Sequence, residues 1–242
     1  MPLNSIDFSR RTQPADLPER MDQPCSREEL RACLRDLAWI NRVLLGYRPT
    51  FHWLDHLRLK RFHQPIRILD VGCGGGDMLR RIARWAAARG IPVELTGLDI
   101  NVDCIAIASE TTGASIPIHW AAGDLFSYVF AAPPHLLISS LVAHHLADAE
   151  LVRFLRWMEQ NAAIGWFIND LSRAPIPYHL LGLVARILRL HPLVQHDGPV
   201  SIARAFHADD WQRLCAEAGL RENDVTIRAW IPARLSVARS KA

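Results

Sequence analysis

The stretch RILDVGCGGGDMLRR, residues 67–81, gives the strongest indication of the fold in this sequence. It opens with an apolar run typical of a buried strand, continues with four glycines within five residues, and turns at Asp77 into a helical pattern. Glycines at such a turn let the backbone approach a ligand closely. The carboxyl end of a first strand is also where doubly wound sheets bind ligands. The stretch therefore predicts an α/β fold with a binding site at this turn.

The same turn excludes two phosphate-binding patterns. In the dinucleotide fingerprint G-x-G-x-x-G, Gly72 and Gly74 match, but the third position is Asp77. A carboxylate at a helix start competes with a pyrophosphate for the same N–H donors and repels it. The pattern G-x-x-x-x-G-K-S/T fails because no Lys-Ser or Lys-Thr pair follows the glycines. We therefore predict a ligand without phosphate.

Strand and helix patterns alternate on the carboxyl side of the turn. Such alternation predicts a parallel sheet with helices on both faces. The predicted strands are 66–71, 93–100, 116–121, 135–142, 165–170, 225–230 and 234–239, and the predicted helices are 50–61, 77–89, 103–110, 148–161 and 208–218.

The remaining segments flank or interrupt this pattern. Residues 1–25 are polar and contain prolines, and we expect a loose arm there. A Ser-x-x-Glu capping box at Ser26 then begins an amphipathic helix. A helical insertion is predicted at about 175–206, after the fifth strand. We therefore divide the chain into an N-terminal arm with lid helices over 1–62 and one α/β domain over 63–242.

Composition narrows the class of protein. The chain has 242 residues, a formal net charge of +3, 50% hydrophobic residues and 22% charged residues, which is typical of a soluble globular protein. So small a charge argues against a nucleic-acid partner. Five cysteines without C-x-x-C spacing indicate neither a disulfide framework nor a metal cluster. No stretch resembles a signal peptide or a membrane span, so we expect a reducing, cytoplasmic setting.

Two aspartates follow the next strands. Asp99 ends the predicted second strand, where a carboxylate can accept both hydroxyls of a ribose. Asp124 follows the third strand, where a carboxylate can accept from an adenine amino group. Taken singly, Asp99 also fits a helix cap and Asp124 a turn residue beside Gly123. Together with the phosphate-free glycine turn, they predict an adenosyl ligand.

Four motifs now carry a resemblance to a known family. LDVGCGGGD, GLDI, AGDLF and SSLVAHHLAD, in this order and spacing, resemble the class I S-adenosylmethionine-dependent methyltransferases. The likeness covers about residues 64–240 and is greatest to the small-molecule enzymes of ubiquinone and menaquinone biosynthesis. It implies a Rossmann-like seven-stranded sheet whose last strand is antiparallel. It also implies S-adenosyl-L-methionine as cofactor, S-adenosyl-L-homocysteine as product, and no metal.

The resemblance also implies roles for individual residues. Asp70 and residues 72–74 border the methionine part of the cofactor. Asp99 holds the ribose, Ile100 packs on adenine, and Asp124 with Leu125 binds the adenine edge. Cys73 is expected to be a small residue packed beneath the cofactor and not a nucleophile. The implied cofactor-binding residues are Asp70, Gly72, Cys73, Gly74, Asp77, Asp99, Ile100, Asp124, Leu125 and Leu141.

Methyl transfer to a hydroxyl requires removal of its proton. A phenol has a pKa of about 10 and a histidine one of about 6.5, so histidine is a suitable base at neutral pH. LVAHHLAD offers His144 and His145 directly after the fourth strand. The stretch resembles plant phenolic O-methyltransferases, in which a catalytic histidine precedes an aspartate, and this match favours His144. His145 stands in place of that acidic neighbour, which leaves three alternatives: His144 is the base and has another supporting partner, His145 is the base, or both imidazoles only shape the pocket.

Other polar residues are candidates with two interpretations each. Asn169 and Asp170 end the fifth strand, where they either bind a substrate oxygen, orient a histidine or form a turn. His52 and His56 have the i,i+4 spacing of a metal pair, but no third ligand follows nearby. His52 and His56 therefore indicate the surface of an amphipathic helix.

The helical insertion is expected to contribute to the acceptor pocket. It is rich in leucine, isoleucine and valine, with Tyr178 and His179 as polar contacts. Arg204 resembles a similarly placed arginine of the quinone-type relatives and would pair with a substrate acid or phenolate, or form a structural ion pair. Two apolar helical covers suggest a hydrophobic acceptor. The same apolar surface would also suit a dimer contact or transient contact with a membrane surface.

These observations combine into one prediction. The chain is expected to be a monomeric or homodimeric methyltransferase that acts on a hydroxyl of a hydrophobic phenol, quinol or polyketide, in secondary or quinone metabolism. Methylation of a ring carbon is the alternative within this chemistry. RNA methylation is disfavoured because SLVAHH stands where an Asn-Pro-Pro-Tyr-like motif would lie. The alternative from another class is a non-catalytic, cofactor-binding partner subunit.

Overall fold

The computed structural model describes residues 6–62 and 64–241, which form a seven-stranded sheet in the order β3-β2-β1-β4-β5-β7-β6. Strand β7 runs antiparallel to both of its neighbours, and the other pairs are parallel. The predicted sheet with an antiparallel last strand is confirmed. The strands are β1 (Ile66–Val71), β2 (Val93–Asp99), β3 (Ile118–Ala122), β4 (Leu136–Ser140), β5 (Gly165–Leu171), β6 (Val225–Trp230) and β7 (Arg234–Ser240).

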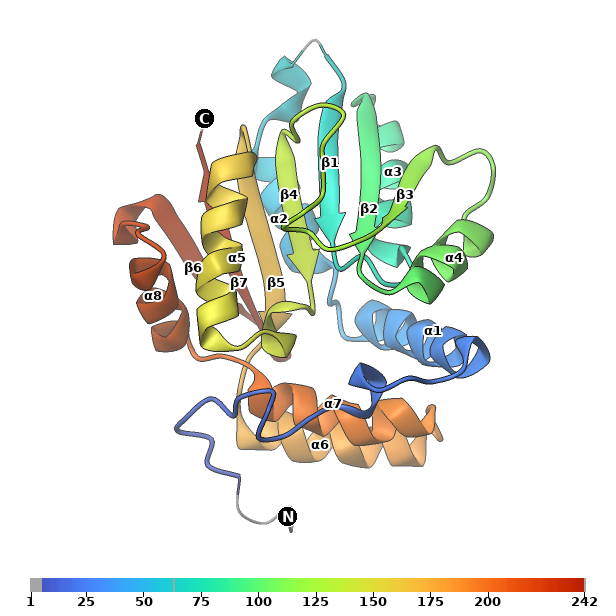
Figure 1. Cartoon of the computed structure of the whole chain (residues 1–242), viewed down its shortest axis with the longest axis vertical. Helices are drawn as coiled ribbons and strands as arrows, with labels where there is room; N and C mark the ends of the chain where they lie inside the picture. The colour runs from blue at the N-terminus through green and yellow to red at the C-terminus, as the bar shows by residue number, and fades with distance from the viewer. Residues whose placement is uncertain (1–5, 63, 242) are drawn as a thin grey trace.

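Helices cover both faces of the sheet. Helices α5 and α8 pack on one face, and α2 and α3 pack on the other (Figure 1). Among the described residues, no helix is both long and apolar enough to cross a membrane. The helices are α1 (Arg27–Val43), α2 (Arg48–His56), α3 (Asp77–Arg89), α4 (Val102–Thr111), α5 (Asp148–Asn161), α6 (Pro175–Ile187), α7 (Pro192–Arg204) and α8 (Ala208–Glu217).

Two predicted elements end earlier than expected, each at a left-handed residue. The helix expected to reach residue 61 ends at His56, because Arg58 takes a φ of 48° and a short 3₁₀ turn follows. Strand β4 ends at Ser140, because Leu141 takes a φ of 61°. Non-glycine residues adopt this conformation at a cost, and such positions concentrate at functional sites. The conformation of Leu141 therefore indicates a candidate functional site at the end of β4.

Helices α1, α6 and α7 lie beyond the carboxyl ends of the strands (Figure 1). The predicted capping box begins α1: Ser26 Oγ accepts from the N–H of Glu29, and the Glu29 carboxylate accepts from the N–H of Ser26. The insertion after β5 is the pair α6 and α7, as predicted. These helices cover the edge of the sheet at which the strand-end residues gather.

The N-terminal arm is not loose, which corrects the sequence-based expectation for its described part, residues 6–25. Arg11 and Glu19 are only 8% and 1% exposed. Phe8 packs edge-on against Tyr178, with ring centroids 5.3 Å apart. Residues 1–5 lie outside the described part of the chain. The polar composition of the arm predicted a free segment. In the structure, charged and aromatic side chains of the arm anchor it to the helices that lie behind it (Figure 1).

Candidate active site

The glycine turn lies between β1 and α3, at the point where the sheet continues to β2 on one side and to β4 on the other. Doubly wound sheets bind ligands at this switch point. Gly72 has a φ of +69°, and its N–H donates to the carbonyl of Leu98 at 2.8 Å. A Cβ on Gly72 would lie 2.3 Å from Cγ2 of Val142. Both the backbone conformation and the close approach therefore require glycine here.

The Asp99 carboxylate is tied to the glycine turn. One oxygen accepts from the N–H of Gly74 at 2.8 Å and the other from the N–H of Asn101 at 2.9 Å. Asn101, and not Asp99, caps helix α4 by accepting from the N–H of Asp103. Burial raises the pKa of Asp99, although these backbone hydrogen bonds oppose the rise. The carboxylate is thus held at the end of β2, where the sequence predicts the ribose contact.

The residues predicted to contact adenine lie on an open surface. Ile100 is 77% exposed, which is unusual for isoleucine and suits a side chain that covers a planar ligand. Asp124 is also exposed and accepts weakly from the N–H of Phe126 at 3.3 Å. Leu125 is half-buried against the core. The adenine roles of these residues stay predictions.

A cavity at the ends of β1, β4 and β5 contains polar atoms that lack protein partners. Within the described residues, Oδ1 of Asp70, Oγ of Ser140 and Oδ1 of Asn169 have no hydrogen-bond partner, and all three residues line this cavity. Burial raises the pKa of Asp70 well above its ordinary value, and the charges of Asp77 and Asp99 raise it further. Buried polar atoms require partners. A ligand with an ammonium group and a carboxylate, such as the methionine part of the predicted cofactor, fits this need.

Three further cavity residues carry no motif in the sequence. The Tyr47 hydroxyl donates a hydrogen bond to Oδ2 of Asp77, with 2.5 Å between the two oxygens. Arg234 is 7% exposed, and within the described part of the chain its guanidinium makes one hydrogen bond, from Nη2 to Oδ1 of Asn41. Burial lowers the pKa of Arg234 to about 10, so it remains a cation at neutral pH. The cavity therefore contains a buried positive charge that the motifs do not reveal.

His144 and Asp170 form a buried pair. The hydrogen bond between Nδ1 of His144 and Oδ1 of Asp170 is 2.7 Å long, and the two residues are 2% and 0% exposed. The backbone N–H of His144 also donates to Oδ2 of Asp170 at 3.3 Å. Burial raises the pKa of Asp170, but the charge and hydrogen bond of His144 outweigh it and keep the pKa below its ordinary value. An ionised Asp170 thus supports His144 from the neighbouring strand.

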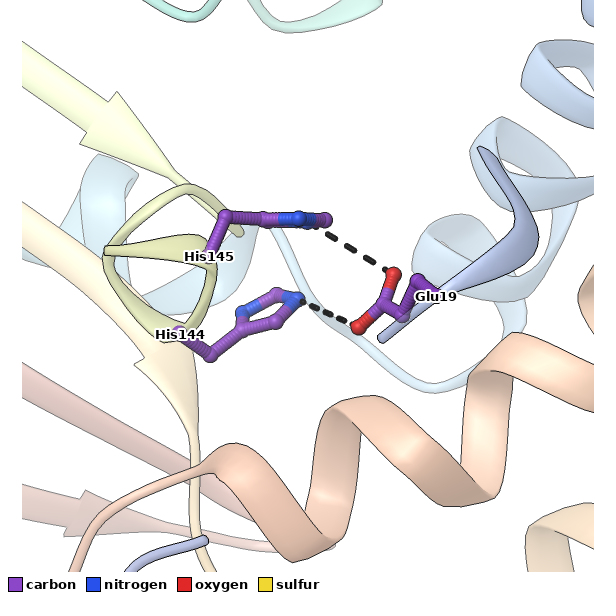
Figure 2. Close-up of side chains that lie close together, drawn as sticks. All are labelled: Glu19, His144 and His145. Carbon is purple, nitrogen blue, oxygen red and sulfur yellow. Dashed lines mark ion pairs between the residues drawn. The ribbon is translucent and has the colours of Figure 1, made fainter. Parts of the chain in front are cut away.

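His145 faces the N-terminal arm, and neither His144 nor His145 is among the residues that line the cavity. Its Nδ1 lies 3.1 Å from Oδ1 of Asp22, and its Nε2 lies 3.7 Å from Oε2 of Glu19. The other oxygen of Glu19 lies 3.7 Å from Nε2 of His144, so one carboxylate faces both imidazoles (Figure 2). Burial raises the pKa of Glu19, and the charges of His145 and Arg204 only partly offset this rise.

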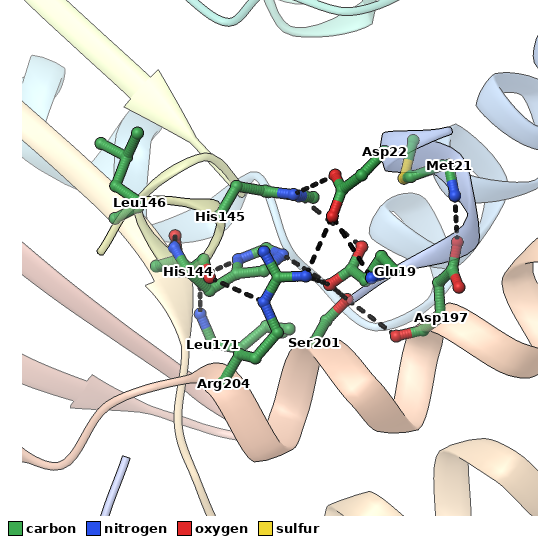
Figure 3. Close-up of polar contacts among 12 residues, drawn as sticks. Glu19, Met21, Asp22, His144, His145, Leu146, Leu171, Asp197, Ser201 and Arg204 are labelled. Carbon is green, nitrogen blue, oxygen red and sulfur yellow. Dashed lines mark hydrogen bonds and ion pairs between the residues drawn. The ribbon is translucent and has the colours of Figure 1, made fainter. Parts of the chain in front are cut away.

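Arg204 and Arg11 hold the arm and the histidine turn together. Arg204 donates from Nε to the carbonyl of His144 at 3.0 Å and from Nη1 to Asp22 at 3.2 Å (Figure 3). Arg11 donates to the carbonyls of Arg204 and Leu146 at 2.8 and 2.7 Å and pairs with Asp148 at 2.6 Å. Arg204 is thus committed to structural contacts, which favours the ion-pair interpretation of its role.

The other predicted substrate residues are not brought to the cavity. Tyr178 is buried among arm and α7 side chains, and His179 is exposed on α6. His52 and His56 stack on each other on α2, with centroids 4.2 Å apart. Cys73 is 6% exposed beneath the turn, and burial raises the pKa of its thiol, so a reactive thiolate is disfavoured. Of the four predicted substrate contacts, the structure brings only Asn169 into the cavity.

Comparison with known proteins agrees with this geometry. The family model described as a methyltransferase domain matches residues 68–163. The ubiquinone biosynthesis O-methyltransferase of Leptothrix cholodnii is 24% identical over 213 residues, which cover 79% of this chain and 85% of that protein. A polyketide synthase of Stachybotrys chartarum and the trans-aconitate 2-methyltransferase of Streptomyces avermitilis are 30% and 36% identical over 36% and 31% of this chain. The chain spans only 4% and 28% of the lengths of these two proteins.

A solved structure extends the likeness to the whole fold. The plantazolicin methyltransferase BpumL, in complex with a desmethyl-plantazolicin analogue and S-adenosylhomocysteine, aligns with a TM-score of 0.63 at 16% identity. The alignment covers 88% of this chain and 96% of that chain.

Residues 68–163 match a methyltransferase-domain model, and the sheet order agrees with the fold of the methyltransferase structure described above. Together with the ubiquinone-type relative, these findings support a class I S-adenosylmethionine-dependent methyltransferase. The orphaned oxygens of Asp70 and Ser140 fit the amino-acid end of S-adenosylmethionine.

Proposed function

We propose that this enzyme methylates a hydroxyl group of a hydrophobic phenol, quinol or polyketide-type small molecule, with His144 as general base. The observation that carries the proposal is the buried pair of His144 and Asp170 at the carboxyl edge of the sheet, where Asp170 follows the cavity residue Asn169 in β5. The relatives named above include enzymes of ubiquinone and polyketide biosynthesis, which supports a small-molecule acceptor.

Asp170 determines what His144 does. An ionised Asp170 holds a proton on Nδ1 of His144, and this leaves Nε2 free to accept the proton of an acceptor hydroxyl. The same carboxylate then stabilises the imidazolium that forms. Bound S-adenosylmethionine supplies an electrophilic methyl group, which no side chain of the protein offers. His144 therefore raises the nucleophilicity of the acceptor oxygen, and the surrounding residues align it.

Two further residues are proposed to act on the acceptor. Asn169 is held by a bond from Nδ2 to the carbonyl of Gly46 at 2.7 Å, which leaves its Oδ1 available in the cavity. The cation of Arg234 would favour a phenolate over a phenol in the same space.

Glu19 lies 3.7 Å from Nε2 of His144, in the direction from which an acceptor oxygen has to come. We therefore propose that the arm and α1 act as a lid, and that Glu19 withdraws when the acceptor binds.

The decisive experiment combines labelled-methyl assays with a base variant. With a neutral phenol, His144→Ala is expected to lower kcat by about 10²–10⁴-fold while S-adenosylhomocysteine still binds. With a nitrophenol that is already ionised at the assay pH, most of the rate should return, because no proton has to be removed. An unchanged rate with the neutral phenol excludes His144 as base.

Two controls separate the alternatives. Asp170→Asn should lower kcat with the neutral phenol in the same direction as His144→Ala, because it removes the charge that orients the imidazole. A loss in His145→Ala but not in His144→Ala would assign the base to the neighbouring histidine. NMR of the product distinguishes O-methylation from methylation of a ring carbon, the second candidate reaction.

A further inference from the structure

Glu19, His144 and His145 present three potential metal ligands to one another. Nε2 of His144 and Nε2 of His145 each lie 3.7 Å from an oxygen of Glu19, and the three ligand atoms lie within 4.8 Å of one another (Figure 2). These distances exceed the range of about 2.7–3.2 Å for a hydrogen bond. The two 3.7 Å distances run to different oxygens of Glu19, and each is close to the edge of about 3.4 Å that metal–ligand bonds of about 2.0–2.2 Å produce in a tetrahedron. Small side-chain shifts would bring the three ligand atoms around one ion.

The second nitrogen of each histidine supplies an independent observation. Nδ1 of His144 is bonded to Asp170 at 2.7 Å, and Nδ1 of His145 is bonded to Asp22 at 3.1 Å. Each carboxylate holds a proton on Nδ1 and directs the lone pair of Nε2 toward Glu19. Metal-ligating histidines nearly always donate the other ring N–H to a carboxylate, a carbonyl or water. Both imidazoles are therefore oriented as metal ligands are.

The local charge also favours a divalent cation. With neutral imidazoles, Glu19, Asp22 and Asp170 contribute three negative charges. Arg204 contributes one positive charge, with Nη1 3.5 Å from Glu19 and 3.2 Å from Asp22 (Figure 3). Glu19 is 1% exposed, and uncompensated buried charge is costly. A divalent ion beside Glu19 would offset the negative charge that Arg204 leaves unbalanced there.

We propose that Glu19, His144 and His145 bind a divalent transition-metal ion, Zn²⁺ in particular, which holds the N-terminal arm over His144. Two histidines and one glutamate, with water in the fourth position, form a ligand set suited to Zn²⁺, whereas Mg²⁺ prefers oxygen ligands. The bound ion occupies the lone pair of Nε2 of His144. Zn²⁺ is thus an inhibitor of the methyltransferase and not a cofactor. This inhibitory consequence rests on the proposed function, whereas the binding site does not.

The binding test uses the full chain after treatment with a chelator. Zn²⁺ is titrated in competition with a chromogenic chelator, and we expect one ion per chain with micromolar or tighter affinity. Glu19→Gln should weaken binding by about 100-fold or more, because a ligand with negative charge is lost. Glu28→Gln, an exposed change on α1, should leave the affinity unchanged. Millimolar Mg²⁺ should not compete.

A thermal shift with S-adenosylhomocysteine checks that Glu19→Gln folds. The new amide retains an oxygen that can accept from Ser201, the present partner of Glu19. Absence of a one-to-one Zn²⁺ site in the wild type, or equal affinity in Glu19→Gln, overturns the proposal.

A second readout follows the arm without any acceptor. Zn²⁺ should slow amide hydrogen exchange around residues 17–24 in the wild type and leave it unchanged in Glu19→Gln. Zn²⁺ that binds without this difference contradicts the pinned arm. Once an acceptor is known, Zn²⁺ should inhibit the wild type much more strongly than Glu19→Gln. Because binding and exchange need no acceptor, failure of the proposed reaction leaves both tests valid.

Discussion

The two halves of the carboxyl edge of the sheet are built in different ways. At β1 and β2, the turn and Asp99 are joined by a hydrogen bond from the backbone N–H of Gly74 to the Asp99 carboxylate, 25 positions apart. At β4 and β5, the residues around His144 are held by Arg11, 133 positions away, and Arg204 reaches Asp22 across 182 positions. The cofactor half therefore depends on local backbone conformation, and the acceptor half depends on long-range side-chain contacts. Changes in each half should have separable effects.

The largest effect is expected from Gly72→Ala. The new Cβ would clash with Val142 at 2.3 Å, and alanine disfavours a φ of +69°. Together these costs amount to about 2–5 kcal/mol of unfolding free energy. We expect a lower Tm and at least a tenfold loss of affinity for S-adenosylhomocysteine, measured by calorimetry. Gly113→Ala is the control, since its nearest neighbour, Oγ of Ser115, lies 3.9 Å away. Equal behaviour of the two variants contradicts the close-approach argument.

A change in the arm tests the other half. Arg11→Met removes the pair with Asp148 and the hydrogen bonds to the histidine turn, and we expect a loss of about 2 kcal/mol of unfolding free energy. Affinity for S-adenosylhomocysteine should stay within about twofold, since no cofactor contact is altered. Arg10→Met is the matched control, because the Arg10 side chain is 85% exposed. If Arg11→Met weakens cofactor binding as much as it destabilises the arm, the two halves are coupled.

The smallest effect, and the most sensitive to pH, is expected at Asp70. Its pKa is raised in the folded chain, so the stability it contributes is fully present below about pH 4 and is lost as pH rises through the raised pKa. Asp70→Asn removes this loss, so the variant should be more stable than the wild type at pH 8, with little difference between the two at pH 4.

Urea unfolding of the cofactor-free chain at both pH values measures this difference. Asp16→Asn, at an exposed position, is the control. Cofactor affinity should fall in Asp70→Asn if the carboxylate meets the ammonium group. A variant that is equally stable at both pH values relative to the wild type would show that Asp70 is not strained by burial.

Local sequence patterns predicted most of the fold. The apolar run before Gly72 and the capping box at Ser26 act through neighbouring residues, and the structure has both elements where they were predicted. The errors fell at Arg58 and Leu141, whose left-handed conformations are imposed by surrounding structure and have no signature in residue type.

The strand and helix order, the glycine turn and the positions of the strand-end carboxylates can be read from the amino-acid sequence, because local hydrogen bonds and periodicity along the chain encode them. That Asp170 supports His144, that Arg234 lies in the cavity and that Glu19 faces both histidines became evident only in the folded molecule. These contacts join segments far apart in the chain, and burial rather than sequence spacing selects them. Desolvated charges must find partners wherever packing brings them together, and that requirement is satisfied only in the folded molecule.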